Sequence, residues 1–170
     1  LIPERSLSLN EQDSDHTALR VGIILSDSIL LIHELSKEGL VGNLQFIRDG
    51  FTQMGAGAGL VETINEYSVR IENGAMTRDD LLVGLEQIAS MSVPDEGFGK
   101  DDRSGPMLQA GAWTAGVALV SQAIIKEKRA DVSDTLLRHG PTAEYFLSYV
   151  RSDGQSKAST PILNQLESSL

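Results

Sequence analysis

Apolar side chains recur along much of the chain at the spacing of an α-helix. Three sets follow this spacing: Leu40, Leu44, Ile47 and Phe51; Leu60, Ile64, Tyr67 and Ile71; and Leu81, Leu85 and Ile88. Each set forms one apolar stripe on a helix with a period of 3.6 residues. No segment shows the sustained apolar–polar alternation that a half-buried strand needs. The pattern therefore predicts an all-α, single-domain helical bundle of roughly six helices.

Turn and capping residues predict where helices begin and end. Asn73-Gly74 is a plausible stop for one helix, and Thr77 can cap the next by accepting from the backbone N–H of Asp80. Three further helical segments are expected: Ala18–Leu35, ending near Gly39; Pro106 to about Lys128; and Val132 to about Val150, with a break at Gly140-Pro141.

The two ends of the chain differ from its middle. Residues 1–14 lack sustained periodicity and are expected to form a flexible N-terminal arm, before a helical bundle domain at 15–151. Residues 152–170 are expected to form a linker and a short amphipathic tail helix that starts at Thr160-Pro161. Both ends carry apolar side chains suited to docking on a partner, and we predict that these bind protein: Leu7, Leu9, Ile162, Leu163 and Leu166.

The segment Leu108–Ile125 (LQAGAWTAGVALVSQAII) contains no charged residue. Its length just suffices for a membrane span, but its Gly, Ala and polar residues contribute little transfer energy into hydrocarbon. We therefore expect no transmembrane segment and interpret it as a central bundle helix, covered by neighbours on nearly all sides. Small residues four apart, Gly111 with Ala115 and Ala112 with Gly116, would let a partner backbone approach closely.

Charge and composition exclude several classes of function. The chain has 170 residues and a net charge of −10, which disfavours nucleic acid because phosphate binding requires clustered Lys and Arg. Cysteine is absent, so disulfides, thiol catalysis and thiolate metal sites are excluded. No catalytic constellation or cofactor motif is found, and MGAGAG fails the spacing of a dinucleotide loop. We expect neither an enzyme nor a bound cofactor.

Asp27 is the most unusual polar residue, because it lies between Ser26 and Ser28 in an otherwise apolar helical segment. A buried carboxylate must be hydrogen-bonded or neutralised. A structural Asp held by protein donors is the favoured interpretation. A ligand site and an Asp that faces water both remain open. As a ligand site, Asp27 would line a pocket between helices together with Tyr67 and Trp113.

No metal site is expected from the three scattered histidines. The loop PDEGFGKDD offers a weak calcium candidate in Asp95, Asp101 and Asp102, since carboxylate oxygens are the ligands calcium prefers. Its spacing does not match an EF-hand, and an acidic surface loop is the simpler interpretation.

Two segments carry a resemblance. LRVGIILSDSILLIHE has Gly and Asp five residues apart, and LQAGAWTAG contains Gly-x-Trp-x-x-Gly. Together they resemble helices of exported, all-helical bacterial proteins of uncharacterised function, over about Ala18 to Lys128, with MGAGAGLVETI as the turn between middle helices. The resemblance implies a helical fold and an extracytoplasmic (periplasmic or secreted) location. It implies no activity and no site residues.

The functional expectation follows from the missing catalytic groups and the two apolar ends. We predict a non-catalytic interaction domain, an accessory or self-assembling subunit that acts through contacts with a protein partner or with copies of itself. The alternative is a small-molecule carrier or sensor with a pocket between helices, which would need a cavity of several hundred Å3.

Overall fold

The computed structural model describes residues 14–91, 104–137 and 140–145. Its helices are α1 (Ser14–Leu30), α2 (Lys37–Gln53), α3 (Ala58–Glu72), α4 (Arg78–Met91), α5 (Ser104–Lys126), the 3-10 turn η1 (Ala130–Val132) and α6 (Ser133–Leu137). Residues 140–145 are also helical. No strand occurs within these ranges, and the predicted all-α class is confirmed.

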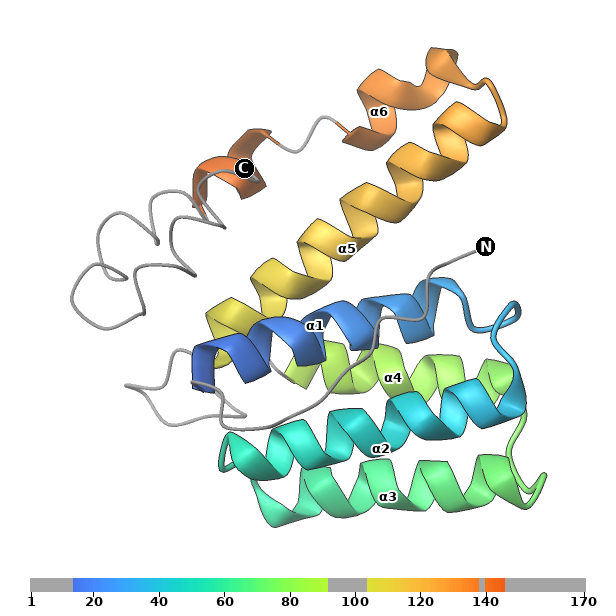
Figure 1. Cartoon of the computed structure of the whole chain (residues 1–170), viewed down its shortest axis with the longest axis vertical. Helices are drawn as coiled ribbons and strands as arrows, with labels where there is room; N and C mark the ends of the chain where they lie inside the picture. Colours follow the sequence, from blue (N-terminus) through green and yellow to red (C-terminus); the bar gives the residue numbers. More distant parts are fainter. Residues whose placement is uncertain (1–13, 92–103, 138–139, 146–170) are drawn as a thin grey trace.

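Helices α1 to α4 form a bundle, and α5 packs on the side of α1 that faces away from α2 and α3 (Figure 1). The most extensive contact between any two helices is that of α1 with α5, followed by α2 with α3 and α1 with α2. The apolar stripes expected from the sequence supply the core: Leu40, Leu44, Ile47, Phe51, Ile64, Leu81, Leu85 and Ile88 are all buried. Each helix thus buries the face that its periodicity marks.

The first helix boundary differs from the prediction. α1 ends at Leu30, and turns extend to Leu35, where the backbone N–H of Leu35 donates to the carbonyl of Leu31 at 3.0 Å. Ser36 then caps α2, because its Oγ accepts from the backbone N–H of Gly39 at 3.0 Å. Gly39 therefore lies in the first turn of α2 and does not end the preceding helix. The Ser36 hydroxyl satisfies one of the backbone N–H groups that have no acceptor within a helix at its N-terminus.

The boundaries between α3 and α4 follow the sequence. After α3, Gly74 adopts φ +69, and the N–H of Ala75 donates to the carbonyl of Arg70 at 2.8 Å, which closes a Schellman-type end. The N–H of Asp80 then donates to Oγ1 of Thr77 at 3.1 Å, as the capping prediction requires. The Asp80 carboxylate accepts in return from the Thr77 hydroxyl at 2.7 Å, and this bond lowers the pKa of Asp80.

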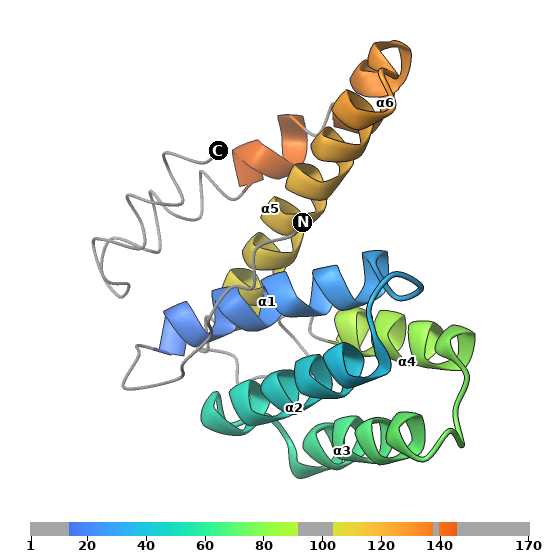
Figure 2. The same cartoon turned by 45° about the vertical axis from the view of Figure 1, so that its right-hand side comes forward.

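Helix α5 begins two residues earlier than expected, at Ser104, and it ends at Lys126 instead of near Lys128. Pro106 lies in its first turn, where a missing N–H removes no intrahelical hydrogen bond. Lys128 stops the helix with φ 54, and the N–H of Arg129 donates to the carbonyl of Ile124 at 3.0 Å. The chain then turns through η1 into α6, which packs back on α5 (Figure 2).

The expected arm and tail lie almost entirely outside the described residues. Ser14, expected in the arm, is the first residue of α1. The bundle expected at 15–151 is described as far as Tyr145, and the tail at 152–170 is not described.

Candidate interaction surface

Two glycines fix where α5 crosses α1. A Cβ placed on Gly22 of α1 would lie 2.8 Å from the carbonyl carbon of Leu108 and 2.9 Å from the nitrogen of Ala112, and closer still to the Leu108 oxygen. A Cβ on Gly111 of α5 would lie 2.9 Å from the carbonyl carbon of Leu19. Real carbon atoms pack at about 3.5–4.0 Å, so neither position has room for a side chain. The two backbones meet through reciprocal glycines.

This crossing shows which of the predicted small residues of α5 lie closest to a neighbouring backbone. The pair Gly111 and Ala115 is buried as expected, whereas Gly116 is only half-buried. A Cβ on Gly116 would lie 3.7 Å from Oγ of Ser26, an ordinary van der Waals distance. The close backbone approach is therefore confined to the first half of α5, and at Gly116 the two helices are far enough apart to leave room for a side chain.

Beyond the crossing, α5 leaves the bundle. Residues 112–125 carry no charge, and Ala115 is the one buried member of this stretch. Figures 1 and 2 show this half of α5 rising away from α1, with η1 and α6 at its far end. A bundle helix whose free half stood in water would ordinarily carry charged side chains there. We refer to residues 116–126 as the distal half of α5.

One face of the distal half continues the stripe that packs on α1. Helical spacing from Gly111 and Ala115 leads to Leu119, Gln122 and Ala123 on the same side. Leu119 is half-buried, and Gln122 and Ala123 are exposed. Leu30, the last residue of α1, lies at the point where the helices separate and is 50% exposed. The surface thus runs from Leu30 along α5.

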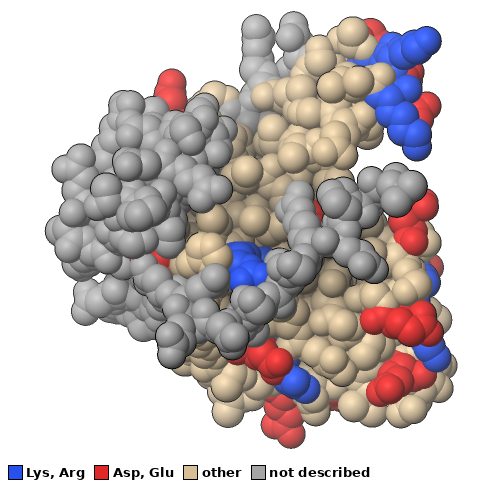
Figure 3. Space-filling view, viewed as in Figure 1, with Lys and Arg blue, Asp and Glu red and all other residues tan. Residues whose placement is uncertain are grey.

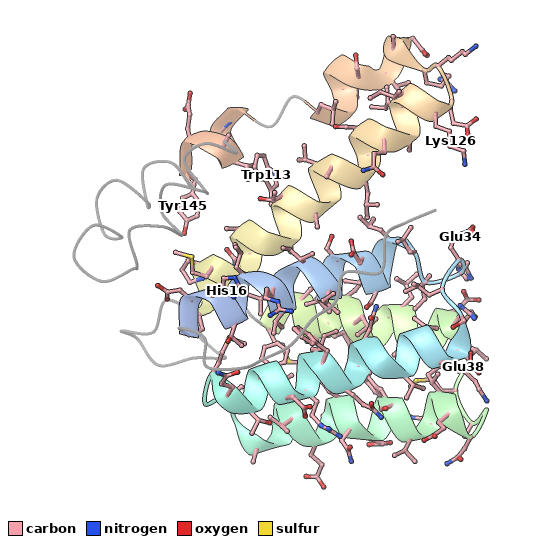
Figure 4. All side chains as sticks on the ribbon, in the orientation of Figure 1. His16, Glu34, Glu38, Trp113, Lys126 and Tyr145 are labelled. Atoms are coloured by element: carbon pink, nitrogen blue, oxygen red, sulfur yellow. The ribbon has the colours of Figure 1, made fainter. Side chains whose placement is uncertain are left out.

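The far end of this surface carries three cations beside two exposed carboxylates, those of Glu127 and Asp131. Lys126, Lys128 and Arg129 are exposed at the tip, where Figure 3 shows the cations gathered. Arg129 donates to the carboxylate of Asp131 at 2.9 Å, which raises the pKa of Arg129 and lowers that of Asp131. Lys126 lies at the tip of α5, on the same side of the molecule as Glu34 and Glu38 in Figure 4.

Helix α5 is also the one helix in the described ranges that is long and apolar enough to cross a membrane, with a mean hydropathy of 1.3. Only 22% of the most apolar 18-residue segment of this helix is buried inside the protein. Its first half, however, is part of the core: Met107, Leu108 and Gly111 are buried, and Leu108 and Gly111 lie against the backbone of α1. A span would require this core contact to open, and the distal half alone, at about 17 Å, is too short for a hydrocarbon core of about 30 Å.

The three residues expected around a ligand pocket lie on three different helices. Asp27 on α1 is half-buried. Tyr67 on α3 packs against Gly84 of α4, while Trp113 on α5 points toward residues 140–145 (Figure 4). α3 and α5 are not among the helix pairs in substantial contact. The arrangement gives no support to a single pocket lined by all three.

A buried polar contact near Asp27 was missed by the sequence analysis. The hydroxyl of Ser28 is fully buried, donates to the carbonyl of Ile24 at 2.7 Å and accepts from Nδ2 of Asn43 at 3.0 Å. It therefore joins α1 to α2. The signal in the sequence was a serine placed among apolar residues, but its partner in another helix could not be recognised without the fold.

A groove of about 500 Å3 lies between α2 and α3. Arg48, Thr52, Ala56, Ala58, Val61, Glu62 and Asn65 line it. The Arg48 guanidinium donates to Asp49 at 2.7 Å and to Oδ1 of Asn65 at 3.1 Å, so its charge is already matched within the protein. The groove has no further buried polar group that would orient a ligand, and it contains none of the residues expected to form a pocket.

Other expected sites fall outside the described residues. These are the calcium candidates Asp95, Asp101 and Asp102 and the partner-binding residues Leu7, Leu9, Ile162, Leu163 and Leu166. Among residues 14–91, 104–137 and 140–145, no group of three or more His, Asp or Glu side chains is placed to hold a metal ion. No family model, curated protein or solved structure matches the chain.

Proposed function

We propose that this chain is a non-catalytic interaction domain that works through protein contacts made by the distal half of α5. The observation that carries the proposal is the uncharged stretch at 112–125, in which Ala115 alone is fully buried and Ala118, Gln122, Ala123 and Ile125 are exposed. Burying apolar surface stabilises by roughly 25 cal/mol per Å2, so this half of the helix favours association. Contiguous apolar patches of this kind mark interaction sites on proteins.

In this proposal the two halves of α5 have different roles. The first half is held to α1 by the glycine crossing, which fixes the direction in which the second half projects. The α5–η1–α6 hairpin then presents a helical face that other helices can pack against, in the manner of helix-in-groove recognition. The cations at the tip supply charge complementarity to acidic partners and orient the encounter.

The test compares the native assemblies of two charge variants in the cells that make the protein. Ala118→Glu with Ile125→Glu places two charges on exposed positions of the distal half, where Ile125 is 76% exposed. The matched control is Val69→Glu with Val83→Glu, on exposed positions of α3 and α4. Circular dichroism and melting temperature first establish that both variants fold like the wild type.

We expect the wild type and the control to be recovered in the same larger complex, with fixed stoichiometry after chemical cross-linking. The α5 variant should be recovered largely free of it. An α5 variant that assembles like the control would contradict the proposal, as would a wild type that remains a monomer in its own cells.

A further inference from the structure

The exposed side chains of the distal half of α5 share one face of the helix. At 100° per residue, the exposed positions among residues 116–126 fall within an arc of about 160°, and the half-buried Leu119 lies inside the same arc. The exposed residues are Ala118, Gln122, Ala123, Ile125 and Lys126. The face is therefore apolar except for one amide and, at its end, one charge. We refer to it as the α5 face.

Gln122 lies at the centre of the α5 face. It follows Ala118, the first exposed position, by four residues and precedes Lys126, the last, by four. When two identical helices pack antiparallel about a two-fold axis, a residue on the axis meets its own copy. A glutamine amide has both donors and an acceptor, so two glutamines can hydrogen-bond each other, whereas two like charges would repel. The centre of the face is thus suited to pairing with itself.

The tip of the α5 face is positively charged. Lys126 lies within the exposed arc, whereas Glu127 lies about 100° further around the helix. Lys128 is exposed directly beyond it. Arg129 donates to Asp131 at 2.9 Å, so the charges of this pair are matched within the protein. Lys126 and Lys128 are therefore the charges that the tip presents to a partner.

The opposite end of the α5 face is negatively charged. Leu30 marks this end, and four residues beyond it Glu34 is exposed in the turn that follows α1. Glu38 is exposed in the first turn of α2. Lys37 is the single Lys or Arg among residues 31–38, and its Nζ donates to the last backbone carbonyl of α3 at 3.0 Å. We refer to Glu34 and Glu38 as the acidic end, which lies on the same side of the molecule as Lys126 in Figure 4.

We propose that a second copy of the chain covers the α5 face, packed antiparallel about a two-fold axis at Gln122. In this arrangement residue 126 of one copy lies opposite residue 118 of the other, and residue 128 lies opposite residue 116. The Cβ position of Gly116 is 4.0 Å from Cδ1 of Leu30, so the tip of each copy approaches the acidic end of the other. The proposal rests on the proposed function, because it names the partner of the surface assigned there to protein contacts.

Local charge favours this arrangement although the chain has a net charge of −10. The screening length is about 8 Å at physiological ionic strength, so charges on the far sides of two copies contribute little. A parallel pair would place Lys126 beside Lys126 and Glu34 beside Glu34, whereas the antiparallel pair places opposite charges together. A lipid bilayer would have to accommodate the Lys126 ammonium and the Gln122 amide of the same face, which is unfavourable.

The α5 face is small for a permanent interface. Its eleven residues correspond to about 17 Å of helix. Transient complexes bury less than about 1,200 Å2 in total, and a contact between two helices of this length belongs to that class even with the paired charges at its two ends. We therefore expect a dimer that dissociates on dilution, with a dissociation constant on the order of micromolar.

The first experiment uses the full chain, whose lack of cysteine allows one to be introduced at a chosen position. Gln122→Cys should form a disulfide-linked dimer under mild oxidation, because a residue on the axis meets its own copy. Ile125→Cys is the matched control, exposed on the same face. In the antiparallel pair the two copies of residue 125 are about 9 Å apart along the helices, beyond the separation of about 7 Å that a disulfide can bridge.

We expect the disulfide-linked dimer to form at least about tenfold faster from Gln122→Cys than from Ile125→Cys. Equal rates from the two positions would contradict the antiparallel pair, because a parallel pair brings both residues onto their own copies. Absence of the Gln122→Cys dimer at a concentration at which the wild type is dimeric would also overturn the proposal.

The second experiment tests the paired charges by sedimentation velocity over a range of concentrations. Lys126→Glu with Lys128→Glu gives both tips the charge of the acidic end, and Glu34→Lys with Glu38→Lys gives the acidic end the charge of the tip. Each variant alone should dimerise at least about tenfold more weakly than the wild type. An equimolar mixture of the two variants should dimerise within about threefold of the wild type, because each tip then meets an end of opposite charge.

Glu62→Lys with Glu86→Lys is the control for the change in net charge, since both residues are exposed on α3 and α4. It should dimerise within about threefold of the wild type. Circular dichroism first establishes that all variants fold. A mixture of the two tip and acidic-end variants that stays monomeric would contradict the pairing, and a wild type that stays monomeric at every concentration would overturn the proposal.

The two proposals can fail separately. If the purified chain dimerises through Gln122 but Ala118→Glu with Ile125→Glu leaves the native complex intact, the dimer stands and the assignment of the α5 face to the native complex is wrong. If the purified chain stays monomeric but the same variant is released from the native complex, the proposed function stands and the partner is a different protein.

Discussion

Replacing Gly22 by alanine is the change that most directly perturbs the position of α5. The new Cβ would lie 2.8 Å from the carbonyl carbon of Leu108, which is about 0.7–1.2 Å shorter than an ordinary carbon contact. The neighbouring atoms belong to backbone, so no side chain can rotate away. α5 must shift as a whole, and its buried contacts through Met107 and Leu108 loosen with it.

The expected loss combines two opposing effects. Overpacking of a rigid site costs about 1–3 kcal/mol, and a backbone clash belongs at the upper end of that range. Alanine is favoured over glycine inside a helix by about 1 kcal/mol. We therefore expect Gly22→Ala to lower the free energy of unfolding by about 2 kcal/mol, which corresponds to a fall in melting temperature of about 4–8 °C for a domain of this size.

Urea denaturation followed by circular dichroism measures the loss, and the fluorescence of Trp113, the single tryptophan, reports on α5 separately. Gly42→Ala is the matched control, because Gly42 is exposed within α2 and nothing lies within 4 Å of its Cβ position. That variant should be stabilised by about 0.5–1 kcal/mol. A Gly22→Ala variant that is as stable as Gly42→Ala would refute the glycine crossing.

Three further changes test the local structure. Thr77→Ala removes the cap of α4 and should destabilise by about 1 kcal/mol in chemical denaturation. The same change should raise the pKa of Asp80 toward its ordinary value, as an NMR titration would show. Because folding lowers this pKa, the stabilising effect of the bond between Thr77 and Asp80 is present at neutral pH and is lost as the pH falls through the pKa of Asp80 in the folded protein. Lys128→Gly should raise the melting temperature, since Lys128 adopts φ 54, at which glycine is unstrained. Phe51→Ala, at a fully buried position, should cost about 3–5 kcal/mol, and a loss under 1 kcal/mol would show that the core is misassigned.

The sequence was most informative where helices have one polar and one apolar face. In α2, α3 and α4 the contrast between faces is strong, so Leu44, Ile64 and Leu85 were correctly placed in the core. Capping residues were predicted equally well where the side chain accepts a hydrogen bond from the first turn of its own helix, as that of Thr77 does. Gly39 was misinterpreted as a stop because glycine is compatible with both a helix end and a first turn.

The direction of α5 could not be predicted in the same way. Its sequence is apolar all round, so periodicity cannot say which face meets a neighbour or where the contact ends. The small-residue pairs were recognised, but the choice of Gly111 over Gly116 depends on Gly22 in a helix far away in sequence. For the same reason the sequence predicted a helix covered by neighbours on nearly all sides, whereas the distal half leaves the bundle.

The most direct test of the account is site-specific photo-cross-linking in the cells that make the protein. A photoreactive amino acid at Gln122, exposed on the distal half of α5, is compared with the same residue at Val83, exposed on α4. The account predicts a discrete covalent adduct of the chain with another protein from Gln122 and none from Val83. No adduct from Gln122, or equal adducts from both positions, would contradict the claim that the distal half of α5 is the interaction surface.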